Sequence, residues 1–393
     1  MKRILIPSAA LLWGLQFAFL SPTLALILVT LFDATAGEVG LILSIYNLSG
    51  FIATLILPTY ADRNRDYLRP MLACGVLTLA LAILLGIASS LPIAVIALVV
   101  FGAPAGVGVS LLFAYLRHSG ASRSDVVNTR ALVSVAWVAG PPLGTLIIAA
   151  FGNLAIIVAV AVVALLNIAV TALMLARQSA ASISSAGSSR PAEEDLSLSK
   201  LGVSLVVGGF VLLQATNTVV ITIMSLFVTQ DLGLDVLWAG VALGVAAGLE
   251  VPALLLIGRL SGRYSSLGLI TTGCVAGIAY YLAMAFVTGP GLLIGIQVLN
   301  AWFFAAVSGV GLALFQQIIP RPGLASGIFA NTRRVGAIVS GTIIGFGAKT
   351  VLGYSGVFAA CAGLTVIAMV MTGIAKRSIK PPGQSGDTLL AQG

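Results

Sequence analysis

The sequence predicts an all-α integral membrane protein with twelve transmembrane helices in two similar six-helix halves. Its composition, its twelve apolar runs and an internal repeat support this. Of the 393 residues, 59% are hydrophobic and 8% charged, whereas soluble domains are about half apolar and about a quarter charged. A soluble fold is therefore excluded. Twelve spans fit the length, because a hydrocarbon core of about 30 Å needs roughly 20 apolar residues per helix.

The apolar runs give the spans in order. The first six lie at residues 5–31, 39–60, 69–89, 91–116, 126–150 and 153–176, and the second six at 201–229, 236–258, 267–287, 291–318, 325–348 and 354–375. The first run follows Lys2 and Arg3, as in a signal peptide. It continues without a small-residue cleavage site, so we expect it to be the first span.

Two polar stretches set the domain boundaries. Residues 177–200 are rich in Ser and Ala and contain clustered acids, so they cannot bury a core. We expect a bundle at 1–176, a flexible cytoplasmic linker at 177–200, a second bundle at 201–375 and a disordered cytoplasmic tail at 376–393.

The basic residues indicate the orientation. With both termini in the cytoplasm, 19 of the 20 Lys and Arg residues fall on the cytoplasmic side or at a helix end facing it, and only Lys349 lies outside. This agrees with the positive-inside rule. The net charge of +8 does not indicate nucleic-acid binding, because the basic residues are scattered singly.

An internal repeat relates the halves. At an offset of 200, Arg63 matches Arg263 and Cys74 matches Cys274, and at an offset of 203 the strings GVG at 106–108 and NTR at 128–130 recur at 309–311 and 331–333. Two six-helix bundles in parallel orientation place a solute site near the bilayer midplane, where they meet.

Glu250 is the only acidic residue well inside an apolar span. A charged side chain at the bilayer centre costs at least about 2.5 kcal/mol, so such acids usually mark ion or proton pathways. We expect Glu250 to bind and release the coupling proton. The alternative is a protonated carboxyl group that donates a structural hydrogen bond to a neighbouring helix.

Amides at similar depths are candidates for solute binding, because they donate to and accept from hydroxyl groups. Asn47 lies one turn before Gly50, the position equivalent to Glu250 in the repeat. The remaining candidates are Gln16, Gln214, Asn217, Gln297 and Asn300. An interhelical hydrogen bond is the alternative role for each. Trp13, Trp137 and Trp302 could stack on a sugar ring or pack in the core.

The sequence offers little for other chemistry. The three cysteines lack metal-ligand spacing and His118 is the only histidine, so we expect no metal site and no enzyme. No GxxxxGK[ST] segment is present, so ATP does not drive the protein directly. We expect no cofactor, only a proton gradient as the energy source, and a monomer with a small solute, protons and lipid as partners.

Two motifs have counterparts in a known family of membrane proteins. The segment PTYADRNRDYLRP places Asp62 and Arg63 as in G-x-x-x-D-R-x-G-R-R, although Pro58 and Arg65 replace its glycines, and so it resembles the loop signature of the major facilitator superfamily. The resemblance implies a conformational latch, with Arg117 and Arg130 as candidate partners of Asp62. GPPLG, with Gly140, Pro141 and Gly144, is similar to the antiporter signature G-P-x-x-G-G, with Thr145 replacing its last glycine.

Longer strings narrow the resemblance. SPTLAL at 21–26, RALVSVAWVAGPPLG at 130–144, AAGLEVPALLL at 246–256 and GVGLALFQ at 309–316 resemble the bacterial sugar efflux transporters. This implies export of sugars or glycosides by proton antiport and alternating access in the bacterial inner membrane. A multidrug/proton antiporter and a proton-sugar symporter of the same fold remain alternatives.

Overall fold

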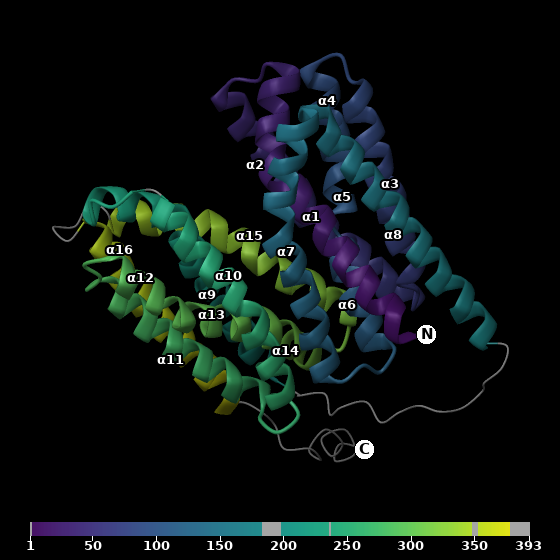
Figure 1. The fold of residues 1–393 in the computed structure, drawn as a ribbon. Coiled ribbons are helices and arrows are strands. Elements are labelled where there is room, and N and C mark those ends of the chain that lie inside the picture. Colours follow the sequence, from purple (N-terminus) through teal and green to yellow (C-terminus); the bar gives the residue numbers. More distant parts are fainter. Residues whose placement is uncertain (1, 183–197, 236, 348–352, 378–393) are drawn as a thin grey trace, which may run out of the picture.

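A computed structural model of the chain describes residues 2–182, 198–235, 237–347 and 353–377, and every element in this part is helical (Figure 1). The N-terminal bundle comprises α1 (Lys2–Phe32), α2 (Ala36–Asn64), α3 (Leu68–Ile87), α4 (Leu91–Ala97), η1 (Leu98–Gly102), α5 (Ala103–Ala105), α6 (Gly108–His118), α7 (Arg123–Phe151) and α8 (Asn153–Ser182).

The C-terminal bundle repeats this arrangement. It comprises α9 (Lys200–Leu226), η2 (Phe227–Asp231), α10 (Leu237–Leu260), α11 (Ser266–Met284), α12 (Pro290–Gly295), α13 (Gln297–Ala305), η3 (Ala306–Val310), α14 (Gly311–Ile318), α15 (Pro322–Gly347) and α16 (Gly353–Arg377). The segments η1, η2 and η3 are π-helical. Two of them, η1 and η3, interrupt the fourth span of each half, which supports the predicted repeat.

Ten helical passages within the described residues are long and apolar enough to cross a membrane. The two other long helices are α1, with 31 residues, and α15, with 26. Outer helices of both bundles expose apolar side chains, among them Ile83, Val162, Val275 and Val370, each at least half exposed. Exposed apolar faces on every side are stable in lipid rather than in water. These features confirm the predicted all-helical membrane fold.

The predicted spans agree with the helices to within a few residues at most ends. Helix α8 continues to Ser182, beyond the predicted end of the first bundle, and α16 continues to Arg377. Most of the predicted linker, residues 183–197, and most of the predicted tail, residues 378–393, lie outside the described residues.

Both bundles have their chain ends on the same side, which we call the terminal face: α1 begins there and α16 ends there (Figure 1). The bundles touch through α7 with α10, α2 with α15 and α6 with α15. Away from the terminal face they diverge into a V (Figure 1). The contact region includes the parts of α2, α7, α10 and α15 nearest the terminal face.

Small residues permit this contact between the bundles. A Cβ added to Gly327 of α15 would meet the Thr54 carbonyl oxygen of α2. On the other side of the V, a Cβ added to Gly258 of α10 would meet the Asn128 side chain of α7. At Gly327 the added Cβ would meet backbone, so this glycine permits direct backbone approach of α15 to α2. At Gly258 the absent side chain leaves room for the Asn128 side chain of α7.

Candidate functional site

Glu250 of α10 lies at the contact between the two bundles, opposite α7. It is 8% exposed, and its Oε1 accepts a hydrogen bond of 2.7 Å from the Ser134 hydroxyl of α7. The Ser308 hydroxyl of η3 is buried beside the carboxyl group. Ten residues separate Glu250 from the end of α10, which corresponds to about 15 Å along a helix. The carboxyl group is therefore near mid-depth. Its hydrogen bond with Ser134 joins α10 of one bundle to α7 of the other.

Two arginines share this environment. Arg130 of α7 and Arg333 of α15 both interact electrostatically with Glu250. Within the described part of the chain, no ion pair within 4.0 Å joins Glu250 to either arginine. Arg333 is exposed, and its guanidinium carbon lies 5.4 Å from the ring centre of Trp137 in the opposite bundle. The site thus combines an acid, two guanidinium groups and an aromatic ring from both halves.

The repeat-related position on the other side of the V has different chemistry. Gly50 of α2 faces Arg334 of α15, whose Nη1 donates to the Gly50 carbonyl oxygen at 2.8 Å. The same nitrogen donates to the Thr54 hydroxyl at 2.8 Å and to Asn331 Oδ1 at 3.0 Å. A Cβ on Gly50 would lie 2.8 Å from Arg334 Nη2, so a larger residue here would require the guanidinium group to shift. This cluster closes the α2–α15 contact.

Asp62 joins the bundles at the terminal face. Its Oδ1 accepts from the backbone N–H of Gly323 and its Oδ2 from that of Leu324, each at 2.8 Å, in the first turn of α15. A carboxylate at a helix N-terminus satisfies free N–H groups and the helix dipole. Tyr67 donates to Oδ1 at 2.7 Å, and burial followed by this bond raises the pKa of Tyr67, so it stays a donor. The partner of Asp62 is therefore a helix end in the other bundle.

The other predicted latch residues lie on three helices, α7, α2 and α6. Arg130 is at the Glu250 site, Arg63 is exposed near the end of α2, and Arg117 lies in the last turn of α6. Their contribution to a latch stays a prediction.

The segment GPPLG lies within α7, which continues as one helix through it. A Cβ on Gly140 would meet the Ala18 side chain of α1, so this glycine permits close helix approach. Gly144 is buried, and the side chain of Pro141 lies outside the described part of the structure.

Three predicted solute contacts bond within their own bundles. Gln16 is 3% exposed and donates to Thr78 at 2.8 Å. Gln297 donates to the Leu293 carbonyl oxygen and accepts from Asn300 at 3.1 Å. Such bonds match the interhelical and intrahelical role that the sequence left open for these amides.

The other three amides form no side-chain hydrogen bond to another helix among the described residues. Asn47 is exposed and donates to the Leu43 carbonyl oxygen of its own helix at 2.8 Å. Gln214 and Asn217 of α9 form no side-chain hydrogen bond with any described residue. A Cβ on Gly336, one turn beyond Arg333, would lie 2.9 Å from the Cβ of Gln214, so this amide is near the level of the arginines. A solute contact by any of the three stays a prediction.

Sequence reasoning placed Arg333 and Arg334 at a helix end, and this was wrong. They are the twelfth and thirteenth residues of α15, about 17 Å from its start. The signal was present, because two adjacent arginines inside an apolar run are expensive in a membrane and indicate function. Ser134 could not be found in this way, since it belongs to the site only through the packing of α7 against the other bundle. Trp137 was a candidate for stacking on a sugar ring, and in the structure its ring lies against Arg333.

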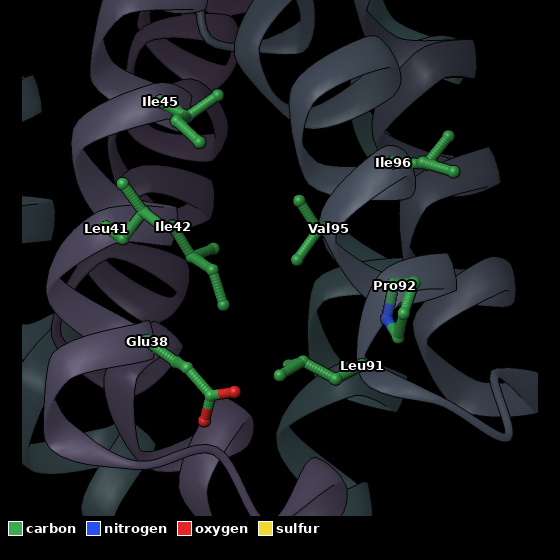
Figure 2. A pocket seen from close by; sticks show the side chains of 8 residues that line it. All are labelled: Glu38, Leu41, Ile42, Ile45, Leu91, Pro92, Val95 and Ile96. Carbon is green, nitrogen blue, oxygen red and sulfur yellow. The ribbon is translucent and has the colours of Figure 1, made fainter.

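A separate apolar groove lies between α2 and α4, away from the terminal face (Figure 2). It is lined by Glu38, Leu41, Ile42, Ile45, Leu91, Pro92, Val95 and Ile96. Its one acid, Glu38, completes a capping box with Thr35, and these hydrogen bonds lower the pKa of Glu38. The groove therefore offers few groups for a polar solute. Within the described residues no group of three metal-ligating side chains is present.

Comparison with known sequences agrees with this architecture. Residues 8–292 match the Major Facilitator Superfamily. The chain is 30% identical over 369 residues to sugar efflux transporter A of Dickeya chrysanthemi, covering 92% of this chain and 93% of that protein. It is 28% identical over 373 residues to sugar efflux transporter A of Escherichia coli K12, with the same coverage. Most of the chain is therefore alignable with transporters.

Solved structures show the same fold. The major facilitator transporter FucP, the E. coli fucose:proton symporter, in its outward conformation has a TM-score of 0.73 at 14% identity, over 95% of this chain and 98% of that one. A bacterial homologue of ferroportin in an outward-facing state has a TM-score of 0.75 at 13% identity, with the same coverage. Two bundles of repeated helices, a polar site between them and the matched sequence give one conclusion: this multi-pass membrane protein belongs to the major facilitator superfamily of transporters and groups there with the bacterial sugar efflux transporters.

Proposed function

We propose that the protein exports a sugar or glycoside in exchange for protons, by alternating access, across the bacterial cytoplasmic membrane. The observation that best supports this is the Glu250 carboxyl group, which is buried at mid-depth and bonded across the two bundles by Ser134. A proton on this group removes its charge and weakens its attraction to Arg130 and Arg333. Protonation therefore acts directly on the contact that alternating access must open and close.

The orientation follows from the charges at the terminal face, which carries Arg63, Arg65, Arg69 and Arg263 in its loops and helix ends. We propose that this face is cytoplasmic, because cytoplasmic loops are enriched in Lys and Arg. The V then opens to the outside, and the present state is outward-facing. In this state Glu250 receives protons from outside while Asp62 and Arg334 hold the cytoplasmic end closed.

Solute binding would use amides that form no side-chain hydrogen bond to another helix in the described part of the chain. Gln214 and Asn217 form no side-chain bond with described residues, and Asn47 is exposed. These amides can donate to and accept from sugar hydroxyl groups. We assign Gln16, Gln297 and Asn300 a supporting contribution through helix packing, since they are buried and bonded to neighbours.

The test is sugar-driven proton movement in proteoliposomes. They are loaded with glucose, lactose, glucuronate or glucose 6-phosphate, with a pH-sensitive dye inside and an acidic medium outside. For one proton per sugar, a pH difference of one unit supports about a tenfold sugar gradient, because each corresponds to about 1.4 kcal/mol. We expect Glu250→Gln to lose this gradient and the coupled acidification while it still exchanges sugar for sugar.

Glu38→Gln is the matched control, because Gln also completes a capping box and the residue lies far from the site. It should behave like the native protein. Proton coupling that persists in Glu250→Gln would refute the assignment of this residue. Sugar uptake driven by an inward proton gradient would replace antiport by symport.

A further inference from the structure

The region where the bundles diverge has an excess of positive charge. Arg130, Arg333 and Arg334 lie within helices α7 and α15, and Glu250 is the one acid more than a turn from a helix end among the described residues. Three arginines and one glutamate leave two positive charges without a counter-charge. Because an unbalanced charge at membrane depth is expensive, each such arginine requires a partner or a function.

Arg334 has its partners within the protein. Its Nη1 donates to the Gly50 carbonyl oxygen, the Thr54 hydroxyl and Asn331 Oδ1, all within 3.0 Å. These contacts hold α2 against α15. Arg334 is thus a structural residue of the closed contact, and it leaves Arg130 and Arg333 to be explained.

Arg333 has N–H groups to offer. It makes no hydrogen bond with any described residue, and it is exposed at the level where the bundles diverge. Its contact with the Trp137 ring engages the charge of the guanidinium group but does not supply an acceptor for its five N–H donors. An acceptor from a bound molecule can reach them.

Arg130 has the same deficit. Its Nε is buried without a hydrogen-bond partner among the described residues. The carboxylate that both arginines face, Glu250, takes its hydrogen bond from Ser134 and lies beyond 4.0 Å from either guanidinium group. One acid therefore serves two arginines without forming a close ion pair with either.

We propose that the solute of this transporter is a sugar acid, whose carboxylate binds Arg333 with Arg130 as the second positive group. A guanidinium fork matches a carboxylate with two parallel hydrogen bonds. The charges also balance: two arginines offset the ionised Glu250 and one carboxylate of the solute. This inference rests on the proposed function for the sugar part of the solute and for a solute-loaded state in which Glu250 has released its proton.

Equilibrium binding to the purified full-length protein in detergent tests the proposal without any gradient. The probes are glucuronate, its uncharged methyl ester, glucose and glucose 6-phosphate. We expect glucuronate to bind at least about tenfold more tightly than its methyl ester and glucose, because a charge-assisted pair with arginine is lost in both. We expect glucose 6-phosphate to bind more weakly than glucuronate, since its second charge is not balanced.

Arg333→Gln should bind glucuronate no more tightly than the methyl ester, and Arg333→Lys should retain part of the preference, because it keeps the charge without the fork. Arg321→Gln, at an exposed arginine before α15, should leave the preference unchanged. Thermal unfolding of each variant checks that it is folded. If Arg333→Gln does not fold, the reduced preference of Arg333→Lys for glucuronate tests the assignment instead.

Four outcomes decide the matter. Equal affinity for glucuronate and its methyl ester in the native protein would overturn the sugar-acid assignment and leave sugar export intact. A preference that survives in both Arg333 variants would also overturn it. Tighter binding of glucose 6-phosphate than of glucuronate would replace the carboxylate by a phosphate. Failure of all four probes to bind would refute the proposed sugar substrate itself.

Discussion

Asp62 illustrates how one side chain can bias the whole transporter. It bonds two backbone N–H groups at the start of α15 in the other bundle, and Tyr67 fixes its orientation from the adjoining loop. Hydrogen bonds to charged groups contribute about 1.5–3 kcal/mol each. The residue is placed where this energy is available only when the terminal face is closed.

We expect Asp62→Asn to shift the equilibrium by about 1–2 kcal/mol toward a state open at the terminal face, because the amide loses the charge and one acceptor. Ser326→Cys reports the change, since Ser326 is 1% exposed in the closed face. A water-soluble maleimide should label it faster by about five- to thirtyfold. Background labelling is low because Cys74, Cys274 and Cys361 are buried.

Asp66→Asn is the control for this measurement, because Asp66 pairs with Arg69 of the same bundle at 3.5 Å and does not join the bundles. Its labelling rate should equal that of the parent. Equal rates for Asp62→Asn and Asp66→Asn would show that the charge of Asp62 does not hold the terminal face closed.

Among the elements, α15 joins the two bundles along much of one side of the contact. It packs against α2 and α6 of the opposite half and against α9 of its own. Its glycines at 323 and 327 face the backbone of α2, at the Pro58 and Thr54 carbonyl oxygens. The same helix continues to Arg333 and Arg334, so its approach to α2 also sets the position of both guanidinium groups.

Gly327→Val should prevent the closed contact, because its Cβ would meet a backbone oxygen that cannot rotate away. We expect faster labelling of Ser326→Cys and loss of sugar binding from the outside. Gly341→Val is the matched control on the same helix, since a Cβ there meets nothing within 4 Å. Similar labelling rates for the Gly327→Val and Gly341→Val variants would show that the close approach at Gly327 does not control the separation of α2 and α15.

In the whole molecule, the two contacts on either side of the V are related by the repeat but differ in chemistry. Asn128 of α7 meets Gly258 of α10 on one side, and Asn331 of α15 meets the Thr54 segment of α2 on the other. Glu250 belongs to one contact and Gly50, its repeat equivalent, to the other. In the proposed mechanism, proton binding acts on one side of the V, while Arg334 closes the α2–α15 contact on the other.

The double variant Asn128→Cys and Gly258→Cys should form a disulfide across the bundles, because a Cβ added at Gly258 would lie against the side chain of residue 128 in the closed state. We expect oxidation to stop transport and a reducing agent to restore it. Each single variant should be insensitive to oxidant. Full transport with the disulfide formed would mean that the α7–α10 contact never opens during the cycle.

Local sequence features were sufficient for much of the molecule. Apolar runs predicted the spans, since the thickness of a bilayer fixes their length. The matching strings at offsets of 200 and 203 predicted two bundles, and the isolated Glu250 stood out against apolar neighbours. These are properties of single segments, and so they can be read without knowing which helices touch.

The composition of the site could not be predicted in the same way. Asp62 was expected to pair with an arginine but bonds a helix end, and Gln16 and Asn300 bond inside their bundles. Arg333 was counted among the arginines at cytoplasmic helix ends, because the positive-inside rule favours basic residues there. In each case the partner depends on which helix faces pack against each other. The sequence around a residue does not show which distant segment will pack against it.

The sequence by itself determined that the chain spans the membrane, that it is duplicated and that one acid is buried at mid-depth, because hydrophobicity and repetition are written along the chain. Only the tertiary structure brought Ser134, Arg130, Arg333 and Trp137 around Glu250, and only it closed Asp62 on α15. The reason is geometric: these contacts cross between bundles, and they exist only in the arrangement that packs α7 on α10 and α2 on α15.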